Sequence, residues 1–199
     1  MNDRIRELLN EINQLEDELR TTLSQQQSSI LFHVNGKKVE FERSIRQTQR
    51  KLKTNFFRWL VTYRPQNLIT GPIIYSMIIP LLITDIFVSF FQATCFPIYG
   101  IKKVRRGDYI VFDRHSLSYL NFIEKFHCEY CAYANGLVAY ITEIIARTEQ
   151  YFCPIKHARK IIGTHRRYPY FIEFGAPVKF AQKQEEYRQQ LANEERPAG

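Results

Sequence analysis

The sequence predicts a mainly α-helical protein in which a membrane-associated helical hairpin, re-entrant or a kinked span, is attached to a small helical domain. Three observations predict this class: one long apolar run, Arg and Lys clusters on both of its sides, and helical spacing of apolar residues over most of the remaining chain. The predicted parts are an amphipathic helix at 1–24, a linker and β-hairpin at 25–42, a basic interfacial helix at 43–64, the membrane hairpin at 65–101, a Cys/His-containing domain at 102–175, and a C-terminal helix and tail at 176–199.

The apolar run extends from Leu68 to Ile101 and contains no Lys or Arg, and Asp85 is its only carboxylate. A single helix crosses a bilayer core with about 20 apolar residues. The run is therefore too long for one simple span and short for two spans with a loop. Its interior is interrupted by proline, which removes a helical hydrogen bond and bends or breaks a helix; these prolines are Pro72, Pro80 and Pro97.

The charges on both sides of the run favour a hairpin. Seven Arg and Lys residues precede it between 43 and 64, and four follow it between 102 and 106. Positive charge in short flanks marks the cytoplasmic side, so both flanks are expected in the cytoplasm. A re-entrant hairpin that breaks near Pro80, with limbs at 68–79 and 81–99, satisfies this expectation. A single kinked span and a buried helix pair in a soluble protein are the alternatives.

The composition supports a membrane partner. A formal net charge of +8 suits an anionic membrane surface or nucleic acid. Because the basic residues cluster beside the apolar run, we expect the lipid bilayer as partner and no nucleic acid. The charged N-terminus predicts no signal peptide. The four cysteines are too few for a disulfide scaffold, and in the cytoplasm they would be reduced thiols or metal ligands.

The N-terminal region carries two local signals. Ile5, Ile12 and Leu19 recur every seven residues, a coiled-coil pattern. Residues 1–24 are therefore predicted to form a homo-oligomer, to dock a partner protein, or to fold back on their own chain. Asn35-Gly36 between two β-leaning runs predicts a hairpin with a type I′ turn.

The basic helix and the apolar run contain residues suited to a membrane. Trp59 and Tyr63 lie on the apolar face of the predicted basic helix, as expected for a helix at the headgroup level. An ionisable group inside a membrane segment is a candidate for function. For Asp85 we favour a structural role, capping the second limb or pairing with backbone freed by Pro80, because the run offers no second ionisable residue as a partner.

The segment after the apolar run has a polar cluster, Asp113-Arg114-His115-Ser116. It could be read as catalytic, but Ser116 fits more simply as the N-cap of a helix. Further helices are predicted from Gly136 to Gln150 and from Val178 to Asn193, and an edge strand from Tyr168 to Phe174.

Four residues have the spacing of metal ligands. Cys128 and Cys131 form a C-x2-C pair, and Cys153 and His157 form a C-x3-H pair. Three thiolates and an imidazole commonly bind zinc, and an iron–sulfur cluster is the alternative. A redox-active cysteine pair and buried structural cysteines are two further interpretations of these residues. The intervening helix, about 22 Å long for fifteen residues, opposes closure unless it is shorter than predicted.

Residues Tyr63 to Lys160, including VRRGDYIVFDRHSLSYLNFIEKFHCEYCAYANGLVAYITEIIARTEQYFCPIKHARK, resemble a family of conserved bacterial membrane proteins, chiefly proteobacterial, to which no function is assigned. The resemblance implies a protein of the bacterial inner membrane. It implies no activity and no ligand set.

Together these observations predict a membrane-anchored, metal-binding structural or assembly component at the cytoplasmic face of a bacterial inner membrane. A metal-free membrane scaffold or oligomerisation protein is the alternative. A monotopic enzyme acting on a lipid-linked substrate through Asp113, His115 or the cysteines has less support, because neither a nucleophile–base pair nor a phosphate-binding loop is readable. We therefore expect a non-enzymatic role.

Overall fold

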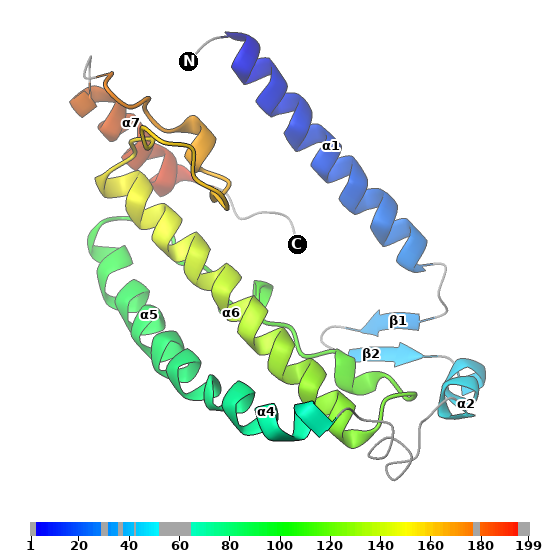
Figure 1. The fold of residues 1–199 in the computed structure, drawn as a ribbon. Helices are drawn as coiled ribbons and strands as arrows, with labels where there is room; N and C mark the ends of the chain where they lie inside the picture. The colour runs from blue at the N-terminus through cyan, green and yellow to red at the C-terminus, as the bar shows by residue number, and fades with distance from the viewer. Residues whose placement is uncertain are drawn as a thin grey trace. The chain divides into compact units, whose positions relative to one another are not determined.

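The computed structural model describes residues 3–28, 32–35, 38–41, 43–51, 65–176 and 180–194, and within them the chain is mainly helical (Figure 1). Two compact units are present. The first comprises Met1–Phe56 with Asp113–Lys125, and the second comprises Phe57–Phe112 with Phe126–Gly199. The second unit contains the apolar run.

The first unit begins with helix α1, Asp3–Ser28, which confirms the predicted N-terminal helix and extends it into the predicted linker. Strands β1, Phe32–Asn35, and β2, Lys38–Phe41, pair antiparallel. Residues 36 and 37 of the expected turn lie outside the described residues, so the type I′ hairpin stays a prediction. Helix α2, Arg43–Lys51, covers the start of the predicted interfacial helix, and the rest of that helix, residues 52–64, also lies outside the described residues.

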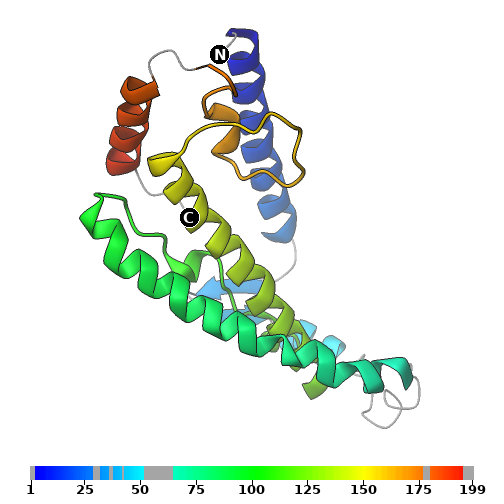
Figure 2. The same cartoon turned by 60° about the vertical axis from the view of Figure 1, so that its left-hand side comes forward.

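The apolar run forms helices α4, Pro65–Ser76, and α5, Ile78–Ile98. We call α4 and α5 together the apolar helix. They are joined through Met77, whose N–H donates to the Ile74 carbonyl at 3.3 Å, and α5 continues in the direction of α4 (Figures 1 and 2). The predicted re-entrant hairpin, with limbs at 68–79 and 81–99, is therefore wrong, and the kinked form describes the backbone.

Pro80 explains why the run bends instead of reversing. It lies in the first turn of α5, so its missing N–H removes a hydrogen bond to the carbonyl of Ser76, and its ring crowds that carbonyl. The effect falls one turn before the proline, at the junction of the two helices. A bend that loses so little hydrogen bonding leaves the axis continuous.

Beyond α5, residues 101–112 form a return segment that runs back along the apolar helix. The 3₁₀ turn η1, Arg106–Asp108, lies within it. A second turn, η2, Arg114–Ser116, precedes helix α6, Phe122–Phe152. The prediction that Ser116 caps this helix is wrong. Asn121 caps it, because its Oδ1 accepts the Glu124 N–H at 2.9 Å while the Glu124 carboxylate accepts the Asn121 N–H at 2.8 Å.

The core of the second unit lies between α5, α6 and the return segment. Gly136 permits their close approach, since a Cβ there would lie 2.5 Å from the Tyr109 carbonyl oxygen. This packing explains why α6 passes through the Asn135-Gly136 pair, where the sequence predicted a helix start. The buried apolar residues of this core are Phe96, Ile101, Val104, Ile110, Tyr133, Leu137, Tyr140, Ile144 and Leu191.

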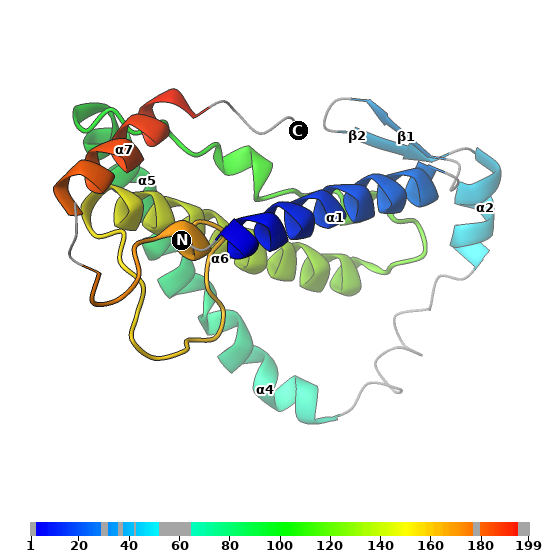
Figure 3. The ribbon, with the colours of Figure 1, turned by 90° about the horizontal axis from the view of Figure 1, so that it is seen from above.

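The chain after α6 forms a loop beside the C-terminal end of that helix (Figure 3). The predicted edge strand at 168–174 is wrong, because residues Tyr168–Tyr170 form the 3₁₀ turn η3 around Pro169, and pairing is limited to one parallel bridge between Ile155 and Ile172. Helix α7, Phe180–Asn193, confirms the predicted C-terminal helix, and its Leu191 joins the core.

Candidate membrane interface

The outward side of the apolar helix is a continuous apolar surface. Among the described residues, one helix, Ile69–Ile98, is long and apolar enough to cross a membrane, and only 6% of its apolar window is buried. Ile69 and Ile98 at its ends are each 77% exposed, and Ile86 near its middle is 69% exposed. An apolar surface of this extent marks a site of contact with lipid or another protein. Its most exposed side chains are Ile69, Ile73, Ile79, Ile86, Phe87, Phe90 and Ile98.

The opposite side of α5 carries polar residues among apolar residues that pack into the core, and it attaches the helix to the protein through Asp85. Arg106 of the return segment donates from Nη2 to the Asp85 Oδ2 at 2.7 Å. The Tyr133 hydroxyl of α6 donates to the same oxygen at 3.0 Å, and the Ser89 hydroxyl donates to Oδ1 at 3.3 Å. The carboxylate is thus saturated by partners inside the chain. Burial of the Tyr133 side chain, together with its hydrogen bond to Asp85, raises the pKa of Tyr133 and keeps its proton in place.

Gln92, two turns further along α5, makes the second attachment. Its Nε2 donates to the Val104 carbonyl at 3.1 Å, and its Oε1 accepts the Val104 N–H at 2.9 Å. The Gln92 side chain also contacts the Tyr140 hydroxyl of α6. A buried backbone peptide of the return segment is therefore satisfied from the apolar helix, as buried polar groups require. These bonds determine which side of α5 faces the protein.

The sequence predicted that Asp85 caps the second limb or pairs with backbone freed by Pro80, whereas its carboxylate binds the side chains of Arg106, Tyr133 and Ser89. Arg106 was predicted only as a flanking charge. The available signal was the spacing of Asp85, Ser89 and Gln92, which puts all three on one side of a helix. That stripe indicates a polar side that needs partners in the protein, although it does not say which residues supply them.

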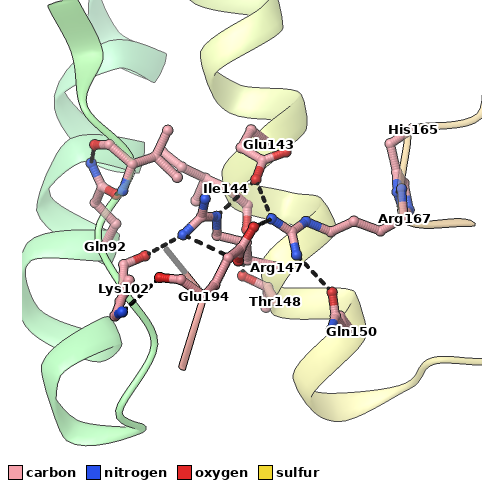
Figure 4. Close-up of polar contacts among 11 residues, drawn as sticks. Gln92, Lys102, Glu143, Ile144, Arg147, Thr148, Gln150, His165, Arg167 and Glu194 are labelled. Carbon is pink, nitrogen blue, oxygen red and sulfur yellow. Dashed lines mark hydrogen bonds and ion pairs between the residues drawn. The ribbon is translucent and has the colours of Figure 1, made fainter. Parts of the chain in front are cut away.

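A second polar group, which we call the charged cluster, lies where α6, the loop and the end of α7 meet (Figure 4). Arg167 donates to the carboxylates of Glu143 at 2.6 Å and Glu194 at 2.7 Å. Arg147 donates to Glu143 at 2.8 Å and to the carbonyl of Lys102 at 2.8 Å. These bonds join α6, the loop, the return segment and the residue that follows α7.

The charged cluster keeps its charges at neutral pH. Burial alone would raise the pKa of Glu143, but hydrogen bonds from Arg167 and Arg147 outweigh it and hold that pKa below its ordinary value. Burial likewise opposes the charge of Arg167, and the carboxylates of Glu194 and Glu143 raise its pKa overall. Charge-assisted bonds of this kind are among the stronger hydrogen bonds in proteins.

A small pocket of about 210 Å³ lies between α6 and the loop, lined by Glu149, His157, His165 and Tyr168 among others. The His165 Nε2 lies 2.8 Å from the Glu149 carboxylate, and its Nδ1 accepts the Arg167 N–H at 3.2 Å. Both ring nitrogens are thus engaged within the chain. The pair fastens the loop to α6 instead of presenting a free base.

The structure separates the Cys128–Cys131 pair from the predicted Cys153–His157 pair. Cys128 and Cys131 lie one turn apart on α6, Cys153 directly follows that helix, and His157 lies in the loop. At 1.5 Å per residue, the helix between Cys131 and Cys153 is roughly 33 Å long. Within the described part of the chain, no group of three or more His, Cys, Asp or Glu side chains is placed to hold a metal ion.

The helix length explains this outcome. The sequence predicted a helix starting at Gly136, which would have left a flexible connection after Cys131, whereas α6 is continuous from Phe122 to Phe152. One copy of the chain as folded here does not bring the two ligand pairs to one ion. Binding of zinc or an iron–sulfur cluster stays a prediction. Asp113 and His115, the residues of the proposed catalytic cluster, are exposed at η2.

Comparison of the chain with protein-family models, with curated proteins and with solved structures gave no match. The resemblance to bacterial membrane proteins therefore stays a prediction, and a functional assignment has to come from the geometry.

Proposed function

We propose that this protein is a membrane-anchored structural or assembly component and that the apolar helix is its anchor. The observation that carries the proposal is the exposure of Ile69–Ile98, a helix apolar enough for a bilayer and only 6% buried over its apolar window. The same helix is held to the rest of the second unit by Asp85 and Gln92. It is thus a fixed element of the fold with one side open to a lipid phase.

The energy available to such an anchor is large. Transfer of one Val, Leu, Ile, Phe or Met side chain out of water is worth about 1.5–3 kcal/mol. The seven most exposed apolar side chains of the helix are 61% to 77% exposed, so covering them with lipid would together contribute roughly 7–15 kcal/mol. A water-facing surface of this size would instead favour aggregation. Membrane attachment is the simplest state in which this apolar surface is covered.

The proposed location is the cytoplasmic face of a bacterial inner membrane. Lys102, Lys103 and Arg105 directly follow the apolar helix and are exposed, and positive charge beside a membrane segment favours the cytoplasmic side. The resemblance noted in the sequence supports the same membrane. Cations at this position also suit the anionic headgroups of that leaflet.

A structural role fits the polar groups better than catalysis does. In the polar networks around Asp85 and in the charged cluster, the charged side chains pair with one another inside the second unit. Such networks hold elements together. The exposed stripe of α1 offers a surface for self-association, the second property expected of a scaffold; its apolar residues are Leu8, Ile12, Leu15, Leu19 and Leu23.

Flotation with phospholipid vesicles tests the anchor. The full chain, purified in detergent and mixed with vesicles of phosphatidylethanolamine and phosphatidylglycerol, should float with them after detergent removal. The variant Ile86→Asn/Phe87→Asn/Phe90→Asn changes only exposed side chains. It should remain in the dense fraction while its circular dichroism stays helical.

The matched control places the same residue type on the loop. Ile161→Asn/Ile162→Asn alters two exposed side chains outside the apolar helix and should leave flotation unchanged. A wild-type chain that is monodisperse without detergent and does not float would overturn the proposal.

A further inference from the structure

We infer that the apolar helix lies in the plane of one leaflet and does not cross the bilayer. The inference rests on the proposed anchor and specifies how lipid contacts it. Two observations within the second unit support it: the course of α6 beside the apolar helix and the position of the return segment.

Helix α6 runs beside the apolar helix from Tyr75 to Tyr99 and in the same direction (Figures 1 and 2). Near the start, the Tyr75 ring lies 5.3 Å from the ring of Phe126. In the middle, Tyr133 binds Asp85. At the end, the Tyr99 ring lies 5.1 Å from that of Phe152. In a membrane, α6 would therefore lie at the same depth as this part of the apolar helix.

The sequence of α6 opposes a crossing. Among the described residues, only Ile69–Ile98 has the length and apolar composition of a membrane span. Helix α6 carries Glu129, Glu143, Arg147 and Glu149 within the part that lies beside the apolar helix. A charged residue at the centre of a membrane helix costs about 2.5–3.5 kcal/mol on insertion scales. A crossing would take several of these charges through the hydrocarbon.

The position of the return segment also opposes a crossing of the bilayer. Because it doubles back along α5, it places Arg106 beside Asp85, near the middle of Ile69–Ile98. The neighbouring Arg105 side chain is 66% exposed. In a perpendicular crossing, both guanidinium groups would lie near the bilayer centre. In a helix parallel to the surface, they lie at the depth of the phosphates, which bind Arg favourably.

The protein-facing side of the apolar helix is compatible with this orientation. Asp85, Ser89 and Gln92 lie opposite the exposed apolar residues, and Asp85 and Gln92 bind the return segment. The side that faces lipid therefore does not have to accommodate these polar groups. All of the second unit would then remain on one side of the membrane.

Depth measurements at three positions test the inference. Trp59 is the only tryptophan of the chain, so Trp59→Phe provides a background into which Ile69→Trp, Ile86→Trp or Ile98→Trp is introduced singly. These positions mark the two ends and the middle of the helix. The full chain is reconstituted in phosphatidylcholine–phosphatidylglycerol vesicles containing lipids brominated at shallow or deep acyl positions, and fluorescence quenching gives the depth of each tryptophan.

An in-plane helix should give the same shallow preference at all three positions, with depths that agree within a few ångströms. Deep quenching at position 86 together with shallow quenching at 69 and 98 would overturn the inference while leaving the anchor intact. Absence of quenching at all three positions in protein that does not float would overturn the anchor itself. Gln182→Trp on the polar helix α7 should be unquenched in every sample and serves as the control.

Discussion

Arg106 binds Asp85 near the middle of the apolar helix, with Nη2 2.7 Å from the carboxylate Oδ2. The Asp85 side chain is almost fully buried, whereas that of Arg106 is 46% exposed. The pair therefore joins the protein-facing side of an apolar helix to a residue that still reaches the surface. The pairing explains how the helix can contain a carboxylate, because an unpaired Asp85 surrounded by lipid would be energetically costly.

Replacement of Asp85 should loosen this attachment. Asp85→Asn removes the charge that receives bonds from Arg106 and Tyr133, and hydrogen bonds to charged groups contribute about 1.5–3 kcal/mol. We expect a loss of about 2 kcal/mol in the free energy of unfolding, or roughly 4–8 °C in melting temperature for a chain of this size, measured by circular dichroism in detergent. Asp108→Asn, which removes the exposed partner of Arg105, should change stability by less than about 0.5 kcal/mol; equal losses in the two variants would contradict the assigned role of Asp85.

Gly136 and Gly71 should respond to alanine in opposite directions. A Cβ at Gly136 would lie 2.5 Å from the Tyr109 carbonyl oxygen, whereas at Gly71 it would meet nothing within 4 Å. Both glycines lie inside helices, where alanine is favoured by about 1 kcal/mol. We expect Gly136→Ala to destabilise the fold by about 1–2 kcal/mol because overpacking outweighs that gain, and Gly71→Ala to be neutral or stabilising. Thermal unfolding measures both, and a stabilised Gly136→Ala variant would show that the return segment does not pack against α6.

The charged cluster should make stability depend on acid pH. Because the pKa of Glu143 is lower in the folded chain than its ordinary value, its contribution is fully present above the unfolded pKa and is lost as pH falls through the folded pKa. We expect the melting temperature to fall on acidification below about pH 5. Glu143→Gln should be less stable at pH 7 and should show a flatter dependence in the acid range. A variant that keeps the wild-type slope would remove Glu143 as the cause.

Metal analysis tests the Cys/His prediction directly. Since α6 holds Cys131 and Cys153 roughly 33 Å apart, a single folded copy should not ligate one ion with both pairs. We expect the metal content of detergent-purified protein, measured by plasma mass spectrometry, to be the same in Cys153→Ser and wild type. One equivalent of zinc, or visible iron–sulfur absorption, that is lost in both Cys128→Ser and Cys153→Ser would restore the four-ligand site and require α6 to be broken.

The apolar stripe of α1 should mediate association of two copies. Leu15 is 57% exposed in the middle of this stripe, and apolar residues at heptad spacing pair with an identical helix. We expect Leu15→Asp to lower the molar mass measured by light scattering to that of the monomer. Gln14→Asp adds the same charge outside the stripe and should leave the mass unchanged. A monomeric wild-type chain would exclude self-association through α1.

Much of the helical framework could be predicted from local sequence. The periodicity of Ile5, Ile12 and Leu19 predicts α1, and the polar amphipathic pattern after Val178 predicts α7. These predictions succeed because helical spacing is a short-range property of the chain. The boundaries at Ser116 and Gly136 failed for a different reason: a capping residue and a helix-interior glycine are decided by neighbours distant in sequence.

The candidate interface was only partly predictable. Its apolar residues and adjacent cations are readable from composition, and these determine that the chain offers a surface suited to lipid. The predicted hairpin failed because two charged flanks and a central proline fit either a reversal or a bend. The structure decided for the bend, since Pro80 lies in the first turn of α5 and removes only one hydrogen bond.

The sequence by itself therefore determined the helices, the apolar run and the positive charge beside it, all of which follow from residue type and local spacing. Only the tertiary structure decided that Arg106 returns to Asp85, that α6 lies parallel to the apolar helix, and that Cys131 and Cys153 are held apart. The physical reason is that these relationships depend on which surfaces pack together. Packing between segments distant in sequence is a property of the whole fold and leaves no local pattern to read.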